Sequence, residues 1–339
     1  MASLKAIAAD LGVSHALVSR VLNNNMGTTR VSQKTREAIL SRAKELDYQP
    51  NPLAVALKKG RKGAVGVFLH EIGVEGSDLS GRFIQSAGRA LADHGLNLWL
   101  QFFEKADEFR HACNEGLLRK LDGLIVAGLA HRDLIDSLHN IEAAGLPVVA
   151  ACHGSMADSL VINFQVDEEI QSSLATRHLL DLGCRHIAHF YTSPMRYSGY
   201  LKAHAERGLI PNKNLAVPST RYSSADGREC MKRLIEAGEF YDGIVTQSDG
   251  QAAGALQYLC LSGVPKEKWP KITGIDDSPI ARDYSLVPLT SATAEMETCA
   301  KLAVTAIYDK MEGKQDIQGQ LITPRLIIRQ STVPDVTAE

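Results

Sequence analysis

Apolar residues recur at helical spacing three times within the first fifty positions. In "LKAIAADL" (4–11) they fall three or four residues apart, with Ser3 placed to cap a helix and Gly12 placed to end it. A second helix is expected over "HALVSRVL" (15–22) after Ser14, and a third follows Ser32. Three short helices with a tight Gly-containing turn between the first two predict an all-α helix-turn-helix domain over residues 1–50.

The second of these helices has two unlike faces. Val18, Val21 and Leu22 point one way, and the opposite face carries His15, Ala16, Ser19, Arg20 and Asn23. The major groove of B-DNA admits one α-helix, whose N-terminal residues reach the base edges. His15, Ala16 and Arg20 are therefore expected to read bases, whereas Ser19 and Asn23 suit phosphates. On periodicity alone, Arg20 is equally explained as a solvated surface charge.

From residue 63 onward, short β-rich runs alternate with amphipathic helical stretches. The first set has strands near 64–70, 96–103, 122–128, 147–151 and 159–164, and helices over 81–94, 107–120 and 131–144. The second set has helices over 168–182, 197–207, 225–237 and 249–262, and strands near 185–191, 215–222, 241–247 and 271–276. This alternation predicts parallel sheets covered on both faces, and two sets predict two Rossmann-like lobes.

Charge is divided unevenly along a chain of otherwise ordinary globular composition. The 339 residues are 45% hydrophobic and 22% charged, with a net charge of -2. Residues 1–62 hold eleven basic and four acidic residues, a balance of +7, and the remaining 26 basic and 35 acidic residues give -9. A basic N-terminal segment followed by an acidic remainder indicates that the N-terminal segment binds a polyanion and the remainder does not.

The segment between the two parts, residues 51–62, has the composition of a linker that can become helical. "YQPNPLAVALKKGRKG" (48–63) begins with two prolines and ends with four basic residues within five positions. A short helix with an exposed Leu57 beside Lys58 is able to enter a minor groove and wedge a base step. The alternative is a flexible tether.

Several other classes of protein lack their usual signals here. No apolar run approaches ~18 residues and no export signal is present, so we expect a cytoplasmic, nucleoid-associated protein without a membrane partner. No phosphate-binding glycine motif follows a strand and no nucleophile–base constellation emerges, so neither an enzyme nor a cofactor is expected. The cysteines show no CxxC spacing, which favours reduced thiols over a metal site or disulfides: Cys113, Cys152, Cys184, Cys230, Cys260 and Cys299.

At this point the chain resembles the LacI/GalR family of transcriptional regulators. The resemblance is carried by "IAADLGVSHALVSRVLN", "VSQKTREAIL", "AKELDYQPNPLAVALKKGRKGAVGV", "TGIDDSPIA" and "PRLIIRQST". It implies that His15 and Ala16 are the main specificity positions, that Arg20 contacts a base, and that Leu57 intercalates beside Lys58. Leu17 departs from the pattern, because family members commonly have threonine there.

The resemblance also implies a periplasmic-binding-protein-like effector and dimerisation domain over residues 63–334. Its first lobe is expected over about 63–164 and 294–320, and its second over about 165–293 and 321–334. The family uses such a body to bind a small molecule, here expected to be a sugar or sugar derivative. The last residues show no leucine heptads, so a tetramer-forming tail is not expected.

Ligands of open α/β sheets bind at the carboxyl ends of strands, where four polar residues of the second lobe are expected. An arginine and an aspartate with an aromatic face between them suit a polyhydroxyl ligand. The four residues also match the family's effector contacts by position, and they are Arg196, Tyr222, Ser248 and Asp276. Ser80 and Phe83 are expected as ligand neighbours from the first lobe, within a stretch that departs from the family pattern.

Each of these positions has a structural alternative. Arg196 is also explained as a surface charge, Tyr222 as a loop aromatic and Asp276 as a turn former. Family members often have asparagine where Ser248 stands, and Asp249 is expected to support the turn. The adjacent Cys152 and His153 suggest a nucleophile or metal site only weakly, because neighbours on a strand end point to opposite sides.

The predicted function is a DNA-binding transcriptional regulator, a repressor in our interpretation, which binds a pseudo-palindromic operator as a homodimer. A small molecule that favours one arrangement of the lobes would change its affinity for the operator. The alternatives are a solute-binding protein with the same body and an enzyme that binds a nucleotide on its parallel sheets.

Overall fold

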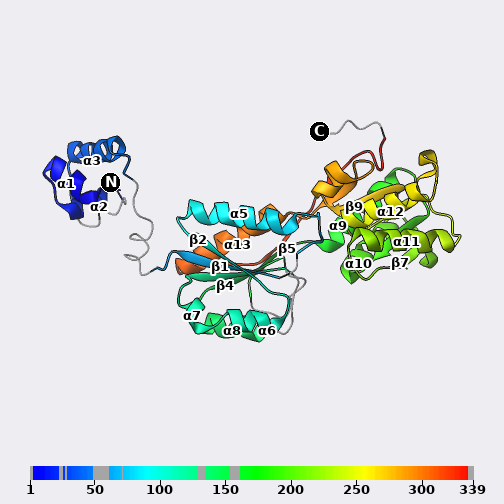
Figure 1. The fold of residues 1–339 in the computed structure, drawn as a ribbon, viewed down its shortest axis with the longest axis horizontal. Coiled ribbons are helices and arrows are strands. Elements are labelled where there is room, and N and C mark those ends of the chain that lie inside the picture. Colours follow the sequence, from blue (N-terminus) through cyan, green and yellow to red (C-terminus); the bar gives the residue numbers. More distant parts are fainter. Residues whose placement is uncertain are drawn as a thin grey trace. The chain divides into compact units, whose positions relative to one another are not determined.

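The fold was obtained as a computed structural model, in which residues 3–22, 26, 29–48, 61–70, 72–128, 134–152 and 161–334 are described. The chain divides into two compact units, residues 1–63 and residues 64–339. The first unit is helical, and the second contains two parallel sheets with helices on both faces (Figure 1).

Three capped helices form the N-terminal unit: α1 Leu4–Leu11, α2 His15–Leu22 and α3 Gln33–Glu45. The hydroxyl of Ser3 accepts a hydrogen bond from the backbone N–H of Ala6 at 3.2 Å, and Ser14 and Ser32 cap α2 and α3 in the same way. Gly12 ends α1 with φ of 62°, a left-handed conformation that costs glycine little. The three helix starts and the turn at Gly12 are therefore confirmed.

The three helices enclose a small core centred on Ile7, Val18, Val21 and Ile39. Leu17, which replaces the expected threonine, packs against this core and is partly buried. Burial of its apolar side chain stabilises the unit, because apolar surface removed from water contributes about 25 cal/mol per Å².

Two six-stranded sheets form the second unit. The first has the order β11-β5-β4-β3-β1-β2, and the second β12-β10-β9-β8-β6-β7. The strands of the first are β1 Ala64–Leu69, β2 Asn97–Phe102, β3 Gly123–Ala127, β4 Val148–Ala151, β5 Asn163–Val166 and β11 Gln320–Ile322. Those of the second are β6 Ile187–Tyr191, β7 Ala216–Pro218, β8 Gly243–Val245, β9 Lys271–Asp276, β10 Thr290–Thr293 and β12 Leu326–Ile327. All neighbours are parallel except β10 and β12.

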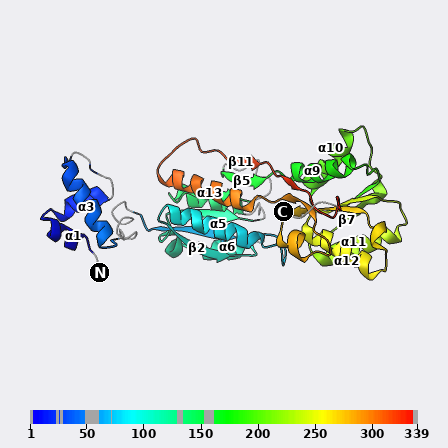
Figure 2. The same cartoon turned by 90° about the horizontal axis from the view of Figure 1, so that it is seen from above.

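Helices cover both faces of each sheet. In the first lobe, α5 (Leu79–Asp93) and α13 (Met296–Met311) lie side by side on one face, and α6 (Ala106–Ala112), α7 (Glu115–Leu118) and α8 (Ile135–Ala143) cover the other (Figures 1 and 2). In the second lobe, α9 (Glu168–Asp181) and α10 (Pro194–Ala205) cover one face, and α11 (Ser224–Glu236) and α12 (Asp249–Leu261) the other. Both faces of the sheets are apolar, as buried parallel strands require.

The chain passes between the two sheets three times. It leaves the first sheet after β5 to form α9, returns from β10 to α13, and crosses again between β11 and β12. The three connections place the carboxyl ends of β5, β9 and β10 near the junction of the lobes, where a ligand site is expected.

The structure differs from the predicted elements in several places, three of which matter for the site or the helix count. The helix predicted over 107–120 is two helices, because Asn114 caps a new start by accepting from Leu117 N at 3.1 Å. The helix predicted over 197–207 begins at Pro194, which puts Arg196 in its first turn. The strand predicted over 215–222 ends at Pro218, so Tyr222 lies in the connection to α11.

Candidate functional site

A cavity of about 1000 Å³ lies between the two lobes, at the carboxyl ends of their strands. The first lobe contributes the segment after β1, the end of β4 and β5, and the connection before β11. The second lobe contributes the start of α9 and the residues that follow β6, β8 and β9. The volume suits a mono- or disaccharide, because ligand pockets of roughly 300–1000 Å³ hold molecules of that size.

Arg196 is the single arginine or lysine among the described residues of the cavity wall, and 11% of its side chain is exposed. Its Nη2 lies 3.2 Å from Glu168 Oε1, its Nη1 donates to the carbonyl of Gln247, and its guanidinium lies 5.5 Å from the ring centre of Tyr222. Burial by itself lowers the pKa of Arg196, but Glu168, Tyr222 and Asp276 together raise it above its usual value. The side chain is therefore a fixed cation in the wall.

Tyr222 and Asp276 complete the group around Arg196. Tyr222 lines the cavity, and burial raises the pKa of its hydroxyl, which is therefore neutral. Asp276 ends β9 with φ of 118°, and 7% of its surface is exposed. Burial and the neighbouring Asp249 raise the pKa of Asp276, against the opposing effect of Arg196. Three of the four residues expected from the second lobe therefore line one cavity.

Ser248 does not line the cavity. Its hydroxyl caps α12 by accepting from Gln251 N at 3.0 Å, and it donates to the carbonyl of Tyr222 at 2.5 Å. The capping geometry turns the side chain away from the cavity and into the base of the loop that holds Tyr222. Asp249 is fully buried and accepts from the hydroxyl and backbone N–H of Ser278 at 2.8 Å each, which agrees with its expected role in the turn.

The two residues expected from the first lobe also lie outside the cavity wall. Phe83 is fully buried in the core between α5 and the sheet, and the hydroxyl of Ser80 donates to the carbonyl of Ile72 at 2.9 Å. Because α5 begins at Leu79, both side chains belong to its first turns and contact their own lobe. The first lobe instead presents the segment from Ile72 to Val74 and the side chain of Leu79.

Several lining residues were missed by the sequence analysis. Gln247 is fully buried, and its Oε1 accepts from the backbone N–H groups of Thr192 and Ser193 at 2.8 Å each. Gln171 is fully buried as well, and its Nε2 donates to the carbonyl of Thr293 at 2.8 Å. The available signal was an amide side chain at a strand end, in "IVTQS" (244–248).

The residues expected to read DNA lie on α2 of the N-terminal unit. His15 and Ala16 are exposed in its first turn, and Ser19 is partly exposed. Arg20 is also exposed, and its Nη1 donates to the hydroxyl of Thr29. This bond orients the guanidinium, so Arg20 is more than a free surface charge. The other three expected DNA contacts lie outside the described residues, and they are Asn23, Leu57 and Lys58.

Comparison with known proteins agrees with both units. Residues 3–51 match the model of bacterial regulatory proteins of the lacI family, and residues 176–332 match that of a periplasmic binding protein-like domain. The HTH-type transcriptional repressor PurR of Haemophilus influenzae strain PittGG is 30% identical over 347 residues, which cover 98% of both chains. The chain belongs to the LacI family.

Other LacI-family proteins match along the whole chain. The regulator GalS of Salmonella typhimurium is 28% identical over 98% of this chain and 96% of its own. Among solved structures, the CelR–cellobiose complex has a TM-score of 0.70 at 24% identity, covering 98% of this chain and all of that one. A lac repressor dimer bound to operator and an anti-inducer also has a TM-score of 0.70, at 22% identity over 98% and 99% of the two chains. These two structures confirm the predicted fold.

Membership of the LacI family decides between the predicted functions. The family consists of regulators, so the prediction of a DNA-binding transcriptional regulator is confirmed, and the enzyme and solute-binding alternatives are not. None of the described helices is long and apolar enough to cross a membrane.

Cys152 carries no sign of catalytic chemistry. Its Sγ lies 3.8 Å from the Sδ of Met296, and contact with the Cys299 thiol together with burial raises the pKa of Cys152 well above its usual value. Such a thiol stays protonated and is a poor nucleophile. His153 lies outside the described residues, and those residues hold no cluster of side chains suited to a metal ion.

Proposed function

We propose that this chain is a repressor that binds a pseudo-palindromic operator as a homodimer, and that a sugar or sugar derivative bound between its lobes changes its affinity for the operator. The proposal of an effector rests on one observation: Arg196, Tyr222 and Asp276 form a group at the carboxyl ends of parallel strands. A cation, a carboxylate and an aromatic face offer donors, acceptors and a stacking surface to a polyhydroxyl ring.

The proposed DNA contacts are supported by the N-terminal unit. His15 and Ala16 stand exposed at the start of α2, the end of a recognition helix that reaches base edges. The balance of +7 over residues 1–62 supplies the attraction to phosphates that dominates affinity. The solved lac repressor in the comparison is bound to its operator as a dimer, which supports the same arrangement here.

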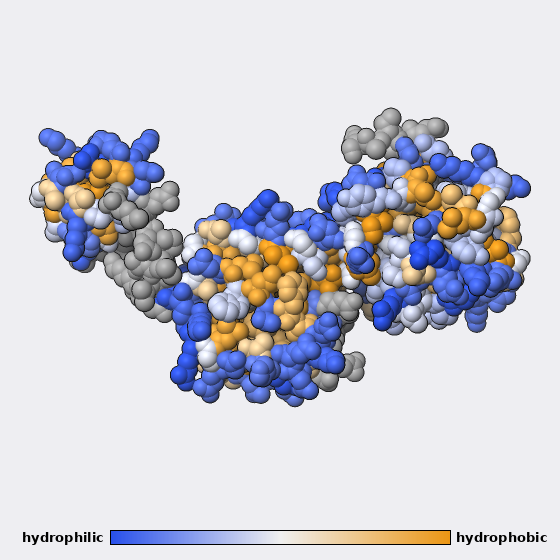
Figure 3. All heavy atoms as spheres, viewed as in Figure 1, coloured by the Kyte–Doolittle hydropathy of each residue, from blue (hydrophilic) through white to orange (hydrophobic). Residues whose placement is uncertain are grey.

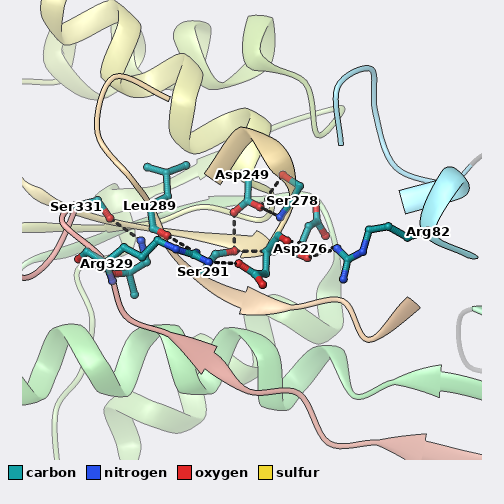
Figure 4. Close-up of polar contacts among 10 residues, drawn as sticks. Arg82, Asp249, Asp276, Ser278, Leu289, Ser291, Arg329 and Ser331 are labelled. Carbon is teal, nitrogen blue, oxygen red and sulfur yellow. Dashed lines mark hydrogen bonds and ion pairs between the residues drawn. The ribbon is translucent and has the colours of Figure 1, made fainter. Parts of the chain in front are cut away.

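Coupling between the lobes is proposed to run through Arg82 of α5. Its guanidinium forms a two-bonded pair with Glu297, at 2.7 and 3.0 Å. Its Nη1 also donates to the carbonyls of Asp276 at 3.2 Å and Asp277 at 3.3 Å, in the other lobe (Figure 4). Asp276 therefore lines the cavity, and its backbone carbonyl accepts a hydrogen bond from Arg82 of the other lobe. A ligand that moves Asp276 also changes this contact between the lobes.

The turn that Arg82 contacts is held firmly in its own lobe. The carboxylate of Asp277 accepts from Arg329 Nη2 at 2.6 Å, and its backbone N–H donates to Ser291 Oγ at 3.0 Å. Ser291 in turn donates to Asp249 at 2.6 Å (Figure 4). Positive φ values at Asp276 and Asp277, 118° and 49°, are maintained by these bonds. A rigid turn moves with its whole lobe, which is the property that a coupling contact needs.

The loop after β1 also spans the two lobes. A Cβ placed on Gly250 would lie 3.5 Å from Val74 Cγ2, and one placed on Gly76 would lie 3.4 Å from Ile280 Cδ1. Both pairs of residues join the two lobes, so opening the lobes would separate them and break the bonds of Arg82 as well. The described arrangement therefore corresponds to the closed state in our proposal.

The dimer surface is proposed to include β2, which ends the first sheet and pairs only with β1 among the described strands. Trp99, Leu100 and Phe102 of this strand are 43%, 36% and 58% exposed. Apolar side chains gather on this lobe between the helix layers in the view of Figure 3. An exposed apolar edge strand marks an association site, because burying it removes apolar surface and unpaired backbone groups from water.

The proposed site of action is the cytoplasm, at the nucleoid, where a regulator of transcription meets operator DNA. The decisive experiment selects genomic fragments with the purified chain and measures affinity by fluorescence anisotropy, with and without a panel of mono- and disaccharides. We expect sequence-selective, salt-sensitive binding that a member of the panel changes. Absence of selective binding under every condition would refute the proposal.

The variant Arg196→Ala separates effector sensing from DNA binding. It should remove the response to the effector and retain operator affinity, because the cavity lies in the second unit and the DNA contacts in the first. Arg119→Ala is the control, since Arg119 is 80% exposed on α7 and pairs only with Glu115 in the contacts described. An unchanged effector response in Arg196→Ala would show that the cavity was wrongly assigned.

A further inference from the structure

Acidic side chains outnumber basic ones on the described wall of the cavity. Asp167, Glu168, Glu169 and Asp276 line it, against Arg196 alone. This inference deepens the proposed function and rests on it, because it assigns the chemical class of the ligand for the same cavity. The question is which of these charges remain available to a ligand once the contacts within the chain are counted.

Two of the four acids have fixed partners of their own. The carboxylate of Asp167 caps α9 by accepting from Ile170 N at 2.9 Å. Glu169 accepts from Lys202 Nζ at 2.8 Å and from Ser198 Oγ at 2.9 Å, and this lowers its pKa. Lys202 therefore compensates the charge of Glu169, whereas Asp167 has a backbone partner and no cationic one, so its negative charge adds to the excess in the cavity.

The cation of the wall is also compensated. Glu168 lies 3.2 Å from Arg196 Nη2 and accepts from Ser193 Oγ at 2.8 Å. Because Arg196 already has a carboxylate partner and a carbonyl acceptor, its charge attracts an anionic ligand weakly. Its buried Nε has no hydrogen-bond partner and can donate to a hydroxyl group of a ligand. Arg82, on the other side of Asp276, is likewise paired with Glu297 through two bonds.

Asp276 is left as a buried carboxylate without an ion pair of its own, because the nearby Arg196 and Arg82 are each paired with a glutamate. Its carboxylate has no hydrogen bond or ion pair with any described side chain, although only 7% of the residue is exposed. A buried carboxylate without a counter-charge is costly, so it either takes up a proton or meets a positive group. The raised pKa of Asp276, caused by burial and by Asp249, reflects the same excess.

Unpartnered amide atoms show what else a ligand must offer. Nε2 of Gln247 and Oε1 of Gln171 have no hydrogen-bond partner, although both residues are fully buried and line the cavity. Oγ1 of Thr192, also on the wall, is unpartnered too. Buried donors and acceptors are almost always satisfied, so a ligand with several hydroxyl groups fits this set.

We propose that the effector is a polyhydroxyl compound carrying a protonated amine, such as an amino sugar, with its ammonium group on Asp276 and its hydroxyl groups on the buried amides. The ammonium supplies the counter-charge that the chain does not, and it offers three donors. Phosphorylated and carboxylated sugars are disfavoured, because they would add negative charge beside Asp276 and Glu168.

The first test uses two small probes that differ in one group. Tris(hydroxymethyl)aminomethane carries three hydroxymethyl groups and an ammonium at about pH 7, and pentaerythritol carries a fourth hydroxymethyl in its place. Binding of each to the full chain is measured by ligand-observed NMR. We expect the ammonium probe to bind about tenfold more tightly, with the preference decreasing as salt is added. Equal binding, stronger binding of pentaerythritol, or no binding of the ammonium probe overturns the inference.

The second test uses sugars matched in the same way: glucosamine, glucose and glucose 6-phosphate, with the galactose and mannose equivalents. The amine should be the preferred member in any series that binds, and preference for the neutral or phosphorylated member overturns the inference.

Variants assign any such preference to Asp276. In Asp276→Asn the tenfold preference for the ammonium probe should fall to about twofold or less, because the isosteric amide removes only the charge. Asp93→Asn, which removes an exposed carboxylate at the end of α5, should retain the preference. A preference that survives Asp276→Asn would overturn the assignment.

The same measurements separate this inference from the proposed function. A neutral or anionic sugar that binds and changes operator affinity overturns the charge inference and leaves the proposed function intact. Failure of every probe and sugar to bind, with operator affinity unchanged throughout, overturns both.

Discussion

His189 should make the second lobe sensitive to acid, and the size of the effect follows from its surroundings. The side chain is fully buried on β6, where its ring lies 4.8 Å from that of Tyr200 and 5.6 Å from that of Tyr197, between ring centres. Burial, and then the neighbouring His204 and Arg196, lower the pKa of His189 to about 3. The folded chain therefore binds this proton less well than the unfolded chain does.

The sign and magnitude follow from proton linkage. Because the folded pKa lies below the unfolded value of about 6.5, the stability that the neutral ring contributes is present above that value and is lost as the pH falls toward 3. Between pH 7 and pH 5 the unfolded state gains about 2 kcal/mol from protonation that the folded state cannot match.

The perturbation is His189→Phe, which keeps a planar ring and removes the titrating group. The free energy of unfolding is measured by urea titration at several pH values for both proteins. The difference in the free energy of unfolding between the two proteins should change by about 2 kcal/mol between pH 7 and pH 5. The wild-type chain should lose stability relative to the variant as the pH falls. Using the difference cancels every other titrating group, including Asp249, whose effect has the opposite direction.

The control is His186→Gln, because His186 is exposed just before the same strand. The His186→Gln protein therefore shows what the loss of an exposed histidine of the same lobe does in the same urea titrations. A pH-independent difference for His189→Phe would refute the conclusion that burial keeps this ring neutral.

Four further predictions concern individual contacts. Burial raises the pKa of Asp249 to about 7, so the stability that its protonated carboxyl contributes is lost as the pH rises from about 4 through 7. This loss is roughly 2 kcal/mol between pH 5 and 7. Asp249→Asn should remove it in the same urea titrations. Trp99→Lys should shift the dimer toward monomer in sedimentation equilibrium, and an unchanged dimer would exclude β2 from the interface. Lys232→Ala is the control, because Lys232 is 48% exposed on α11 of the second lobe. Gly199→Ala should destabilise the chain by about 1–3 kcal/mol, because the added Cβ would lie 2.1 Å from a backbone oxygen of α9; thermal unfolding at the wild-type temperature would contradict this. Arg82→Gln should retain operator binding and reduce the change that effector causes in operator affinity, and a full response would show that coupling runs elsewhere.

Much of the fold was predictable because its signals are local. Serine caps, the turn at Gly12 and the alternation of strands and helices depend on residues close in sequence, and those elements were confirmed. The errors also have local causes. Asn114 caps a second helix within a stretch whose apolar periodicity is continuous, and Pro194 starts α10 three residues earlier than its apolar pattern does.

The candidate site was predictable in part. Arg196, Tyr222 and Asp276 follow strands, and the carboxyl ends of parallel strands meet at one edge, so their convergence follows from chain order. Ser248 and Phe83 were wrongly expected to line the cavity, because strand order does not say which way a side chain turns. A cap bond decides the direction of the first, and core packing decides that of the second.

By itself, the sequence determined the architecture, the family and the basic N-terminal segment followed by an acidic remainder, because each depends on patterns of residue type along the chain. Only the tertiary structure decided which charges of the cavity are already compensated. Glu168 and Arg196, Glu169 and Lys202, and Arg82 and Glu297 pair across large separations in sequence. These pairings leave the carboxylate of Asp276 without an ion pair among the described residues. Electrostatic compensation depends on distance in space, which residue order does not specify.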